Sequence, residues 1–153
     1  MSPKVYKAFA RIIMEHYRGR QMPRKVLEIG ASAWTLLTIG AFEKARRVAL
    51  NVEFPNISPQ LEKCELVVGS SWKTDFNNGE FDCVLSCSTF EHDKYFWMSL
   101  LEIRRIISVG GFMVVGVPVY MKLPTDRLST TLTYERHGYS YNAGLPAACL
   151  VTT

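Results

Sequence analysis

Residues 81–92 read F-D-C-V-L-S-C-S-T-F-E-H and carry the most informative pattern in this chain of 153 residues. The first eight residues form a nearly continuous apolar run that follows the turn-forming N-N-G at 77–79, which predicts a buried strand. A second apolar run, K-Y-F-W-M-S-L-L-E-I-R-R-I-I, predicts a helix over 94–107. S-V-G-G at 108–111 ends that helix and leads into F-M-V-V-G-V-P, a predicted strand over 112–118.

The same alternation extends upstream of this stretch. K-V-L-E-I-G (25–30), R-V-A-L-N-V-E-F (47–54) and L-V-V-G (66–69) predict three further strands. Residues 33–45 predict a helix that Gly40 weakens. Short apolar strands that alternate with helices are typical of a parallel sheet covered on both faces. The expected fold class is therefore α/β, a three-layer α-β-α sandwich around a mostly parallel sheet.

The chain begins with an amphipathic segment and ends in a polar one. Ser2 suits an N-cap, Pro3 the first helical position and Gly19 the end of a helix, so residues 1–20 predict an N-terminal helix. We expect one domain over 1–153, with this helix, a core over 24–118 and an irregular tail over 119–153. Within that tail only 129–134 has the pattern of a strand.

Composition is that of an ordinary soluble protein, with 48% hydrophobic and 21% charged residues. No apolar run approaches the roughly 18 residues that span a bilayer, and the N-terminus does not resemble a signal peptide, so we expect a cytoplasmic protein without a membrane partner. Residues 1–47 hold ten Lys or Arg and three acids. We interpret this charge as a solvated helix face and expect no nucleic-acid partner, because aromatic residues do not interleave with it.

The four cysteines do not have the spacing of a metal site. Cys83 and Cys87 lie four residues apart within a predicted strand, which places them on one face but too far apart for a close pair. Cys64 and Cys149 stand alone in the sequence. We therefore expect reduced thiols and no bound metal.

Parallel sheets bind ligands beyond the carboxyl ends of their strands, so the residues after each strand are the candidates for a site. The first of these turns, R-K-V-L-E-I-G-A-S-A-W at 24–34, contains one glycine. Alone it is consistent with a cofactor-binding turn, with a nucleophile turn that exposes Ser32, or with a plain strand–helix junction. Glu53 lies 23 residues after Gly30, a separation at which a carboxylate accepts hydrogen bonds from ribose hydroxyls in dinucleotide folds.

Taken in order, the motifs V-L-E-I-G-A-S, N-V-E-F, V-V-G-S-S-W, F-D-C-V-L-S-C-S-T-F-E-H and G-G-F-M-V-V-G-V-P resemble those of class I, Rossmann-like S-adenosylmethionine-dependent methyltransferases, similar to methyltransferase type 11. The resemblance covers about residues 24–118, and its last two motifs are the most specific. It implies a Rossmann-like methyltransferase sheet, S-adenosyl-L-methionine as cofactor, and transfer of its methyl group to an unidentified acceptor, expected to be a small molecule.

The resemblance also implies a role for individual positions around the cofactor. Glu28 and Gly30 would flank the methionine moiety, with the backbone from Gly30 through Ala31 to Ser32 close to it. Glu53 would hold the ribose. Ser70, Ser71 and Trp72 would line the adenine. Cys87 and Ser88 would lie beneath the sulfonium.

The acceptor would enter beside the residues that follow the fourth predicted strand. Glu91 and His92 would lie at this mouth, and His92 is the candidate general base because an imidazole titrates near neutral pH. His137, in the tail, is a weaker candidate for the same role.

The chain departs from the family pattern in ways that keep other functions open. Ser32 and Trp34 stand where glycines are usual, Ser70 stands where an acid is common, and the connection from Glu53 to Cys64 is too short for the usual helix. The tail is too short for the full set of C-terminal strands, which leaves the strand at 112–117 near a sheet edge unless the tail or a partner covers it, and makes a homodimer through that edge an expectation. The alternatives are a degenerate or truncated methyltransferase fold without catalysis and, more remotely, a serine hydrolase that uses Ser32.

Overall fold

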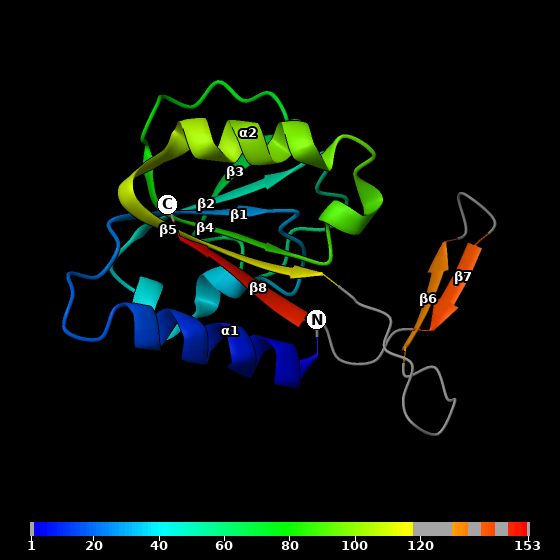
Figure 1. Cartoon of the computed structure of the whole chain (residues 1–153), viewed down its shortest axis with the longest axis horizontal. Helices are drawn as coiled ribbons and strands as arrows, with labels where there is room; N and C mark the ends of the chain where they lie inside the picture. The colour runs from blue at the N-terminus through cyan, green and yellow to red at the C-terminus, as the bar shows by residue number, and fades with distance from the viewer. Residues whose placement is uncertain (1, 118–129, 135–138, 143–146, 153) are drawn as a thin grey trace.

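The structure, a computed structural model, describes residues 2–117, 130–134, 139–142 and 147–152, with side chains described over 2–117. A six-stranded sheet has the order β3-β2-β1-β4-β5-β8, in which the first five strands are parallel and β8 is antiparallel to β5 (Figure 1). Its strands are β1 (Lys25–Ile29), β2 (Arg46–Asn51), β3 (Glu65–Val68), β4 (Phe81–Cys87), β5 (Ile107–Val117) and β8 (Ala147–Thr152). The expected α/β sandwich with a mostly parallel, Rossmann-like sheet is confirmed.

Two α-helices cover opposite faces of this sheet, α1 (Pro3–His16) and α2 (Phe96–Ile106) (Figure 1). Ser2 caps α1, since its Oγ accepts a hydrogen bond of 3.3 Å from the Val5 amide, and Pro3 occupies the first turn as predicted. After α1, Gly19 has a φ of +73°, a conformation that glycine adopts without steric cost.

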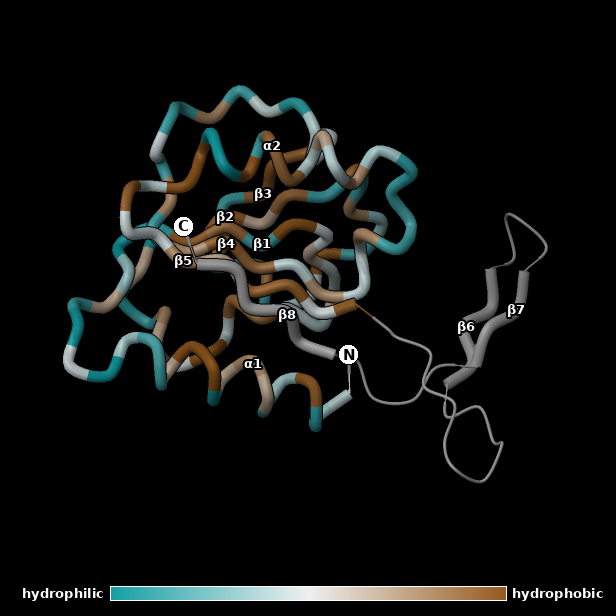
Figure 2. The backbone as a smooth tube through the Cα atoms, in the orientation of Figure 1, coloured by the Kyte–Doolittle hydropathy of each residue, from teal (hydrophilic) through white to brown (hydrophobic). Residues whose placement is uncertain are grey.

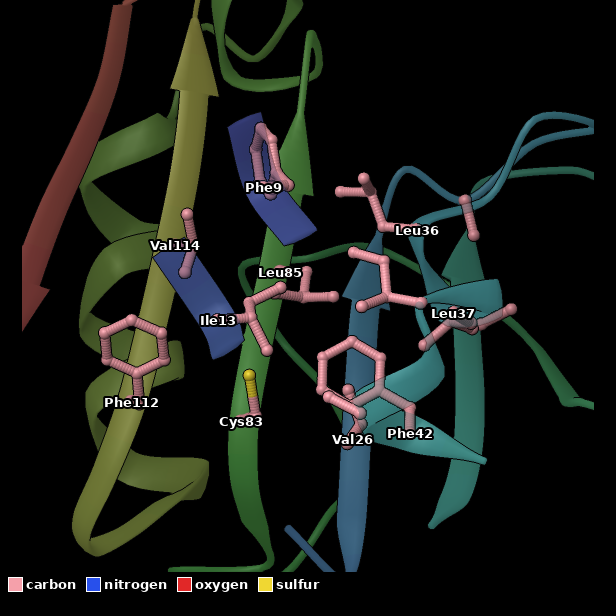
Figure 3. Packing of buried hydrophobic residues seen from close by; sticks show 14 of the residues in the cluster. Phe9, Ile13, Val26, Leu36, Leu37, Phe42, Cys83, Leu85, Phe112 and Val114 are labelled. Carbon is pink, nitrogen blue, oxygen red and sulfur yellow. The ribbon is translucent and has the colours of Figure 1, made fainter. Parts of the chain in front are cut away.

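Alternation along the strands separates two apolar layers. Val26 of β1 and Phe112 of β5 face α1, where they pack with Phe9 and Ile13 (Figure 3). The intervening positions, such as Leu27, face α2. Figure 2 shows the central strands mostly in brown, as expected for hydrophobic residues between the two helical layers. The sheet is thus buried on both faces, which explains why its strands read as continuous apolar runs.

The helix predicted over 33–45 is wrong. In its place lie two short 3₁₀ helices, η1 (Leu36–Thr38) and η2 (Gly40–Phe42). Thr35 caps η1 and is itself held by Glu28 of β1, so the chain is fixed by a tertiary contact before a full α-helical turn can form. Ile39 has an extended ψ of 130° and separates the two pieces.

The Gly-Gly sequence that was predicted to precede this strand lies inside β5, where the pairing with β4 is irregular. β5 pairs with β4 through Phe81–Ile107 and then through Cys83–Phe112, so the residues 108–111 bulge out of the ladder. Gly110 has a φ of +76° in this bulge. The connection between β2 and β3 contains turns and no helix over residues 52–64, as the short spacing predicted.

Of the alternatives for the strand at 112–117, the structure has the tail covering it, because β8 pairs along β5 from Phe112–Thr152 to Val117–Ala147. This pairing removes the observation on which the expected homodimer rested. The predicted strand at 129–134 is confirmed as β6 (Thr130–Tyr134), which pairs with β7 (Tyr139–Asn142) in a separate two-stranded sheet. The side chains of His137 and Cys149 lie outside the part of the chain whose side chains the structure describes.

Candidate functional site

A pocket of about 450 Å³ lies at the carboxyl ends of four parallel strands. It is lined from the segments after β1, β2, β3 and β4, by Gly30, Asn51, Val52, Ser70, Ser71, Trp72, Ser88, Thr89, His92 and Asp93. Six of the sequence-predicted positions therefore lie around one cavity, and these are Gly30, Ser70, Ser71, Trp72, Ser88 and His92. This is the place where an open parallel sheet binds its ligand.

Gly30 forms the floor of the pocket below the turn after β1. Its φ is +79°, and its amide donates to the Leu50 carbonyl at 2.8 Å. A Cβ at this position would overlap the Thr89 side chain, with Cγ2 at 2.6 Å and Cβ at 2.8 Å. Only glycine fits here, because the Thr89 side chain of the segment after β4 occupies the space that a Cβ would need.

Glu28 is buried behind this turn and does not line the pocket. Its carboxylate accepts hydrogen bonds from the Thr35 hydroxyl and from the Leu36 amide, the latter at 3.0 Å. Burial raises the pKa of Glu28 to about 7, which these hydrogen bonds only partly offset. No free helix N-terminus follows this turn, because the amides of Leu36 and Leu37 are taken by Glu28 and Thr35.

The next residues of the turn, Ala31, Ser32 and Trp34, have side chains that do not line this pocket. Ala31 is fully buried, and its carbonyl accepts a 2.8 Å hydrogen bond from the Asn51 side chain. Ser32 is exposed and is not among the pocket residues. Trp34 is 66% exposed and lines a second pocket of about 340 Å³ together with Tyr6 and Lys7 of α1. The indole at this glycine position thus leaves the larger pocket free.

Asn51 and Glu53 lie at and just beyond the end of β2, and of these two only Asn51 lines the pocket. Asn51, the last residue of β2, lines the cavity, and its side-chain oxygen also accepts from the Val52 amide at 2.8 Å. Glu53 is exposed in the connection that follows and is not a lining residue. Asn51 was not predicted from the sequence, although a polar side chain that ends an otherwise apolar strand was a signal for it.

A hydrogen-bond cluster connects the segment after β3 with the start of α2. Ser71 Oγ lies 2.8 Å from Ser99 Oγ and 3.4 Å from Asp93 Oδ2. Ser99 is completely buried and donates to the same Asp93 oxygen at 2.6 Å. Asp93 was not predicted from the sequence either, because it follows a motif whose other residues already had roles. This cluster fixes the wall of the pocket that Ser70 and Trp72 continue.

The segment after β4 supplies the opposite wall. Ser88 has a φ of +52°, the one positive value for a non-glycine in the described chain, and its amide donates to the Gly116 carbonyl at 2.8 Å. Cys87 does not line the pocket and packs with the α1-facing core, where burial raises the pKa of its thiol. The left-handed backbone at Ser88 carries local strain at this strand end.

Glu91 and His92 lie in the short 3₁₀ helix η3 (Phe90–His92), which follows β4. His92 lines the pocket with its side chain about half exposed, and its Nε2 lies 3.8 Å from Glu91 Oε1. Burial raises the pKa of the Glu91 carboxyl. The imidazole thus contacts both the cavity and solvent, so a proton taken up in the cavity could be passed on to water.

The thiols and the remaining titratable groups form no metal cluster in the described part of the chain, where no three His, Cys, Asp or Glu side chains are placed to hold an ion. Cys64, Cys83 and Cys87 are free thiols, and Cys83 is fully buried in the sheet. Within the described residues, no helix has the length and apolar character needed to cross a membrane.

Comparison with known proteins decides the family. A family model described as a methyltransferase domain matches residues 29–115, which is more than half of the chain and reaches every strand that borders the pocket. The chain belongs to the methyltransferase domain family. No curated protein matches the sequence significantly.

Solved structures of methyltransferases share this fold. A putative S-adenosyl-L-methionine-dependent methyltransferase from Methanococcus maripaludis is 16% identical, with a TM-score of 0.59 over 75% of this chain and 56% of its own. A putative sarcosine dimethylglycine methyltransferase from Galdieria sulphuraria is 15% identical, with a TM-score of 0.63 over 76% of this chain and 48% of its own.

A third structure contains ligands. Phosphoethanolamine N-methyltransferase 2 from Haemonchus contortus, in complex with phosphomonomethylethanolamine and S-adenosylhomocysteine, is 15% identical, with a TM-score of 0.60 over 77% of this chain and 30% of its own. This methyltransferase-domain chain thus spans about half the length or less of these three proteins. At such identities the likeness shows the fold.

Proposed function

We propose that this methyltransferase domain binds S-adenosylmethionine in the 450 Å³ pocket and transfers its methyl group to a small-molecule acceptor. The observation that carries the proposal is the pocket itself, which collects residues from the ends of β1, β2, β3 and β4 inside the region that the family model matches. Its volume lies in the range of roughly 300–1,000 Å³ that suits ligands of this size.

The residues present fit the cofactor. Gly30 lines the pocket at the end that we assign to the methionine moiety, where it packs against Thr89 without a side chain of its own. Asn51, and Glu53 in the connection beyond it, offer oxygen acceptors for the ribose hydroxyls. Ser70, Ser71 and the indole of Trp72 line the end that we assign to the adenine.

Glu28 and Cys87, which the resemblance placed against the cofactor, do not line the pocket, and in this proposal they support residues that do. Glu28 holds the turn through Thr35 and Leu36 and so shapes the methionine end without lining it. Cys87 supports Ser88 from the core side, with the two side-chain atoms Sγ and Oγ 3.8 Å apart. Ala31 and Ser32 approach the cofactor, in this proposal, through their backbone.

The bound cofactor supplies an electrophilic methyl group on a sulfonium. The chain contributes alignment, because an in-line displacement depends chiefly on how the acceptor is held against that methyl group. His92, at the rim of the pocket, accepts the proton of an acceptor that must lose one as it reacts. Glu91, 3.8 Å from His92 Nε2, stabilises the imidazolium that results.

A degenerate or truncated methyltransferase fold without catalysis, with a binding or structural role, is the second candidate, and one observation favours it. The turn after β1 has no α-helix behind it, and the first amides of η1 are occupied by Glu28 and Thr35. The cofactor would therefore lose backbone donors that a helix N-terminus offers. Ser32 lacks the positive φ of a nucleophile turn, so no observation favours a serine hydrolase.

Calorimetric titration tests cofactor binding. S-adenosylhomocysteine should bind the wild-type chain with a micromolar dissociation constant, whereas NAD at the same concentrations should not bind. Glu53→Gln should weaken S-adenosylhomocysteine about 10-fold if the carboxylate holds the ribose, by the loss of hydrogen bonds to a charged group. Glu62→Gln is the matched control, since Glu62 is an exposed acid in the same connection.

The same titration separates the outcomes. A chain that remains folded and gives no heat with millimolar S-adenosylhomocysteine contradicts the proposal. Binding that Glu53→Gln leaves unchanged assigns the ribose to Asn51 instead. Binding without methyl transfer to any acceptor in a panel of small amines, phenols and carboxylates would support the second candidate.

A further inference from the structure

The second pocket, of about 340 Å³, is formed by the start of α1, the segment after β1 and the connection after β2. Its lining residues are Ser2, Pro3, Tyr6, Lys7, Trp34, Thr35, Thr38 and Gln60. None of them lines the 450 Å³ pocket, so the proposed function gives this cavity no role. Its volume lies near the lower end of the range of roughly 300–1,000 Å³ for small-molecule sites, which suits a ligand smaller than the cofactor.

Trp34 gives this pocket an aromatic wall that the proposed function leaves unused. It stands where the methyltransferase pattern usually has a glycine, and its indole is 66% exposed. Tyr6 of α1 supplies a second ring, whose Oη lies 3.2 Å from Oγ1 of the lining residue Thr38. Aromatic side chains bury a large apolar area against a planar partner. A planar ligand in this pocket would therefore cover an indole that the free chain leaves in water.

The charge at this pocket is positive. Lys7 is the one charged residue of the lining, and its ammonium makes no ion pair with any residue of the described chain. The first turn of α1 contains no acid. The Glu28 carboxyl behind the lining residue Thr35 is buried, and burial raises its pKa to about 7, so it remains partly protonated at neutral pH. The pocket therefore favours an anion over a cation.

We propose that this pocket is a second ligand site, which binds a small planar aromatic carboxylate with its ring against Trp34 and Tyr6 and its carboxylate at Lys7. A single ammonium in the lining matches a ligand with a single negative charge. The side-chain amide of Gln60, also in the lining, adds a donor for the second carboxylate oxygen. The inference does not rest on the proposed function, because the two pockets have no lining residue in common.

Titration with two probes of one shape tests this site. Naphthalene-2-carboxylate and naphthalene-2-carboxamide have the same ring system, and only the first is charged. The wild-type chain should bind the carboxylate about 5-fold more tightly, the ratio expected for one partly exposed ion pair. Amide chemical shifts followed in the same titration should change at Lys7 and Trp34, together with the indole N–H of Trp34, and should locate both probes in this pocket.

Two substitutions, each with a matched control, separate the ring from the charge. Trp34→Ala should weaken both probes about 10-fold through the lost aromatic contact, whereas Trp97→Ala, at an exposed tryptophan outside the pocket, should weaken neither. Lys7→Gln should abolish the preference for the carboxylate and leave the affinity for the carboxamide unchanged. Lys4→Gln removes the same charge from an exposed position of α1 that does not line the pocket, and it should keep the preference.

The outcomes separate this site from the cofactor pocket. Equal affinities for the two probes, no binding at millimolar carboxylate, or shifts that cluster at Gly30 and Ser88 would each overturn the inference. An equal loss of preference in Lys4→Gln and Lys7→Gln would also overturn it, since the helix charge as a whole would then attract the anion. Carboxylate binding at Lys7 and Trp34 in a chain that fails to bind S-adenosylhomocysteine would support this inference and contradict the proposed function.

Discussion

Gly30 holds the turn at the floor of the cofactor pocket with a φ of +79°. Gly30→Ala should lower the free energy of unfolding by about 2–4 kcal/mol, because the left-handed conformation costs an alanine about 1–2 kcal/mol and its Cβ overlaps Thr89. Urea unfolding measures this change. Gly40→Ala is the control: no heavy atom lies within 4 Å of a Cβ there, and it should cost less than about 0.5 kcal/mol.

Relief of the overlap gives a second check at this position. Gly30→Ala combined with Thr89→Ala removes Cγ2 and Oγ1 of Thr89 from the clash but leaves the strained backbone. The double variant should therefore recover part of the stability lost in Gly30→Ala. A cost for Gly30→Ala equal to that of Gly40→Ala would contradict the role assigned to Gly30.

Glu28 makes stability depend on pH, because burial raises its pKa from 4.5 to about 7 in the folded chain. Between these values the native state holds a proton that the unfolded chain has released, so the free energy of unfolding falls as the pH rises from about 4.5 through 7. In Glu28→Gln the loss of stability between pH 5 and pH 8 should be smaller than in wild type by about 2–3 kcal/mol.

Urea unfolding at the two pH values measures this difference. Glu62→Gln, at an exposed position, should keep the wild-type pH dependence. Parallel pH profiles for Glu28→Gln and wild type would show that Glu28 is not the group responsible.

The strand ends and the resemblance to methyltransferases together predicted six of the ten residues that line the pocket, and the exceptions have physical reasons. Ser70, Ser71, Trp72, Ser88 and His92 were found because strand ends of a parallel sheet meet at one edge. Asn51 and Asp93 were missed because their place in the site depends on backbone direction after a strand ends, which no periodicity encodes. Glu28 was assigned to the cofactor by its motif, yet the fold uses its carboxylate to hold Thr35.

At the scale of elements, α2 holds the connection between β3 and β4 through one acid. Glu102 accepts from the Thr74 amide at 2.8 Å and from Thr74 Oγ1 at 2.6 Å, and it pairs with Arg105. Arg105 in turn donates to the Phe76 carbonyl at 2.8 Å. The guanidinium of Arg105 holds the pKa of the Glu102 carboxyl at about 2, so the carboxylate stays ionised at neutral pH.

Glu102→Gln should therefore lower the free energy of unfolding by about 1–2 kcal/mol, through the loss of charge-assisted hydrogen bonds. Amide hydrogen exchange should also become faster over 73–79, the segment that this pair holds against α2. Arg104→Gln, at an exposed position of the same helix, is the control and should change neither quantity measurably. Equal effects of the two substitutions would mean that the pair adds no stability.

The elements themselves were predictable where burial and propensity agree. The five parallel strands, α1 and α2 were expected within a few residues, because each contains a continuous apolar run or an apolar stripe in the sequence. The helix over 33–45 was not formed, since the sequence pattern carries no sign of the contact between Glu28 and Thr35. The pairing of β8 with β5 could not be predicted either, because the sequence of residues 147–152 does not specify which strand they pair with.

At the scale of the whole molecule, the sheet brings together segments that lie far apart in the sequence. Gly30, Asn51, Ser71 and Ser88 meet around one cavity because β1, β2, β3 and β4 are parallel and adjacent in the order β3-β2-β1-β4. All four residues lie within residues 29–115, which the methyltransferase domain family model matches. The central claim is that S-adenosylmethionine binds at this edge.

An amide chemical-shift titration of the wild-type chain with S-adenosylhomocysteine tests that claim most directly, because it locates the ligand as well as detecting it. We predict saturable shifts that cluster at Gly30, Asn51, Ser71 and Ser88, with small changes around the second pocket at Lys7 and Trp34. Shifts confined to that second pocket, or none at millimolar ligand in a folded sample, would contradict it.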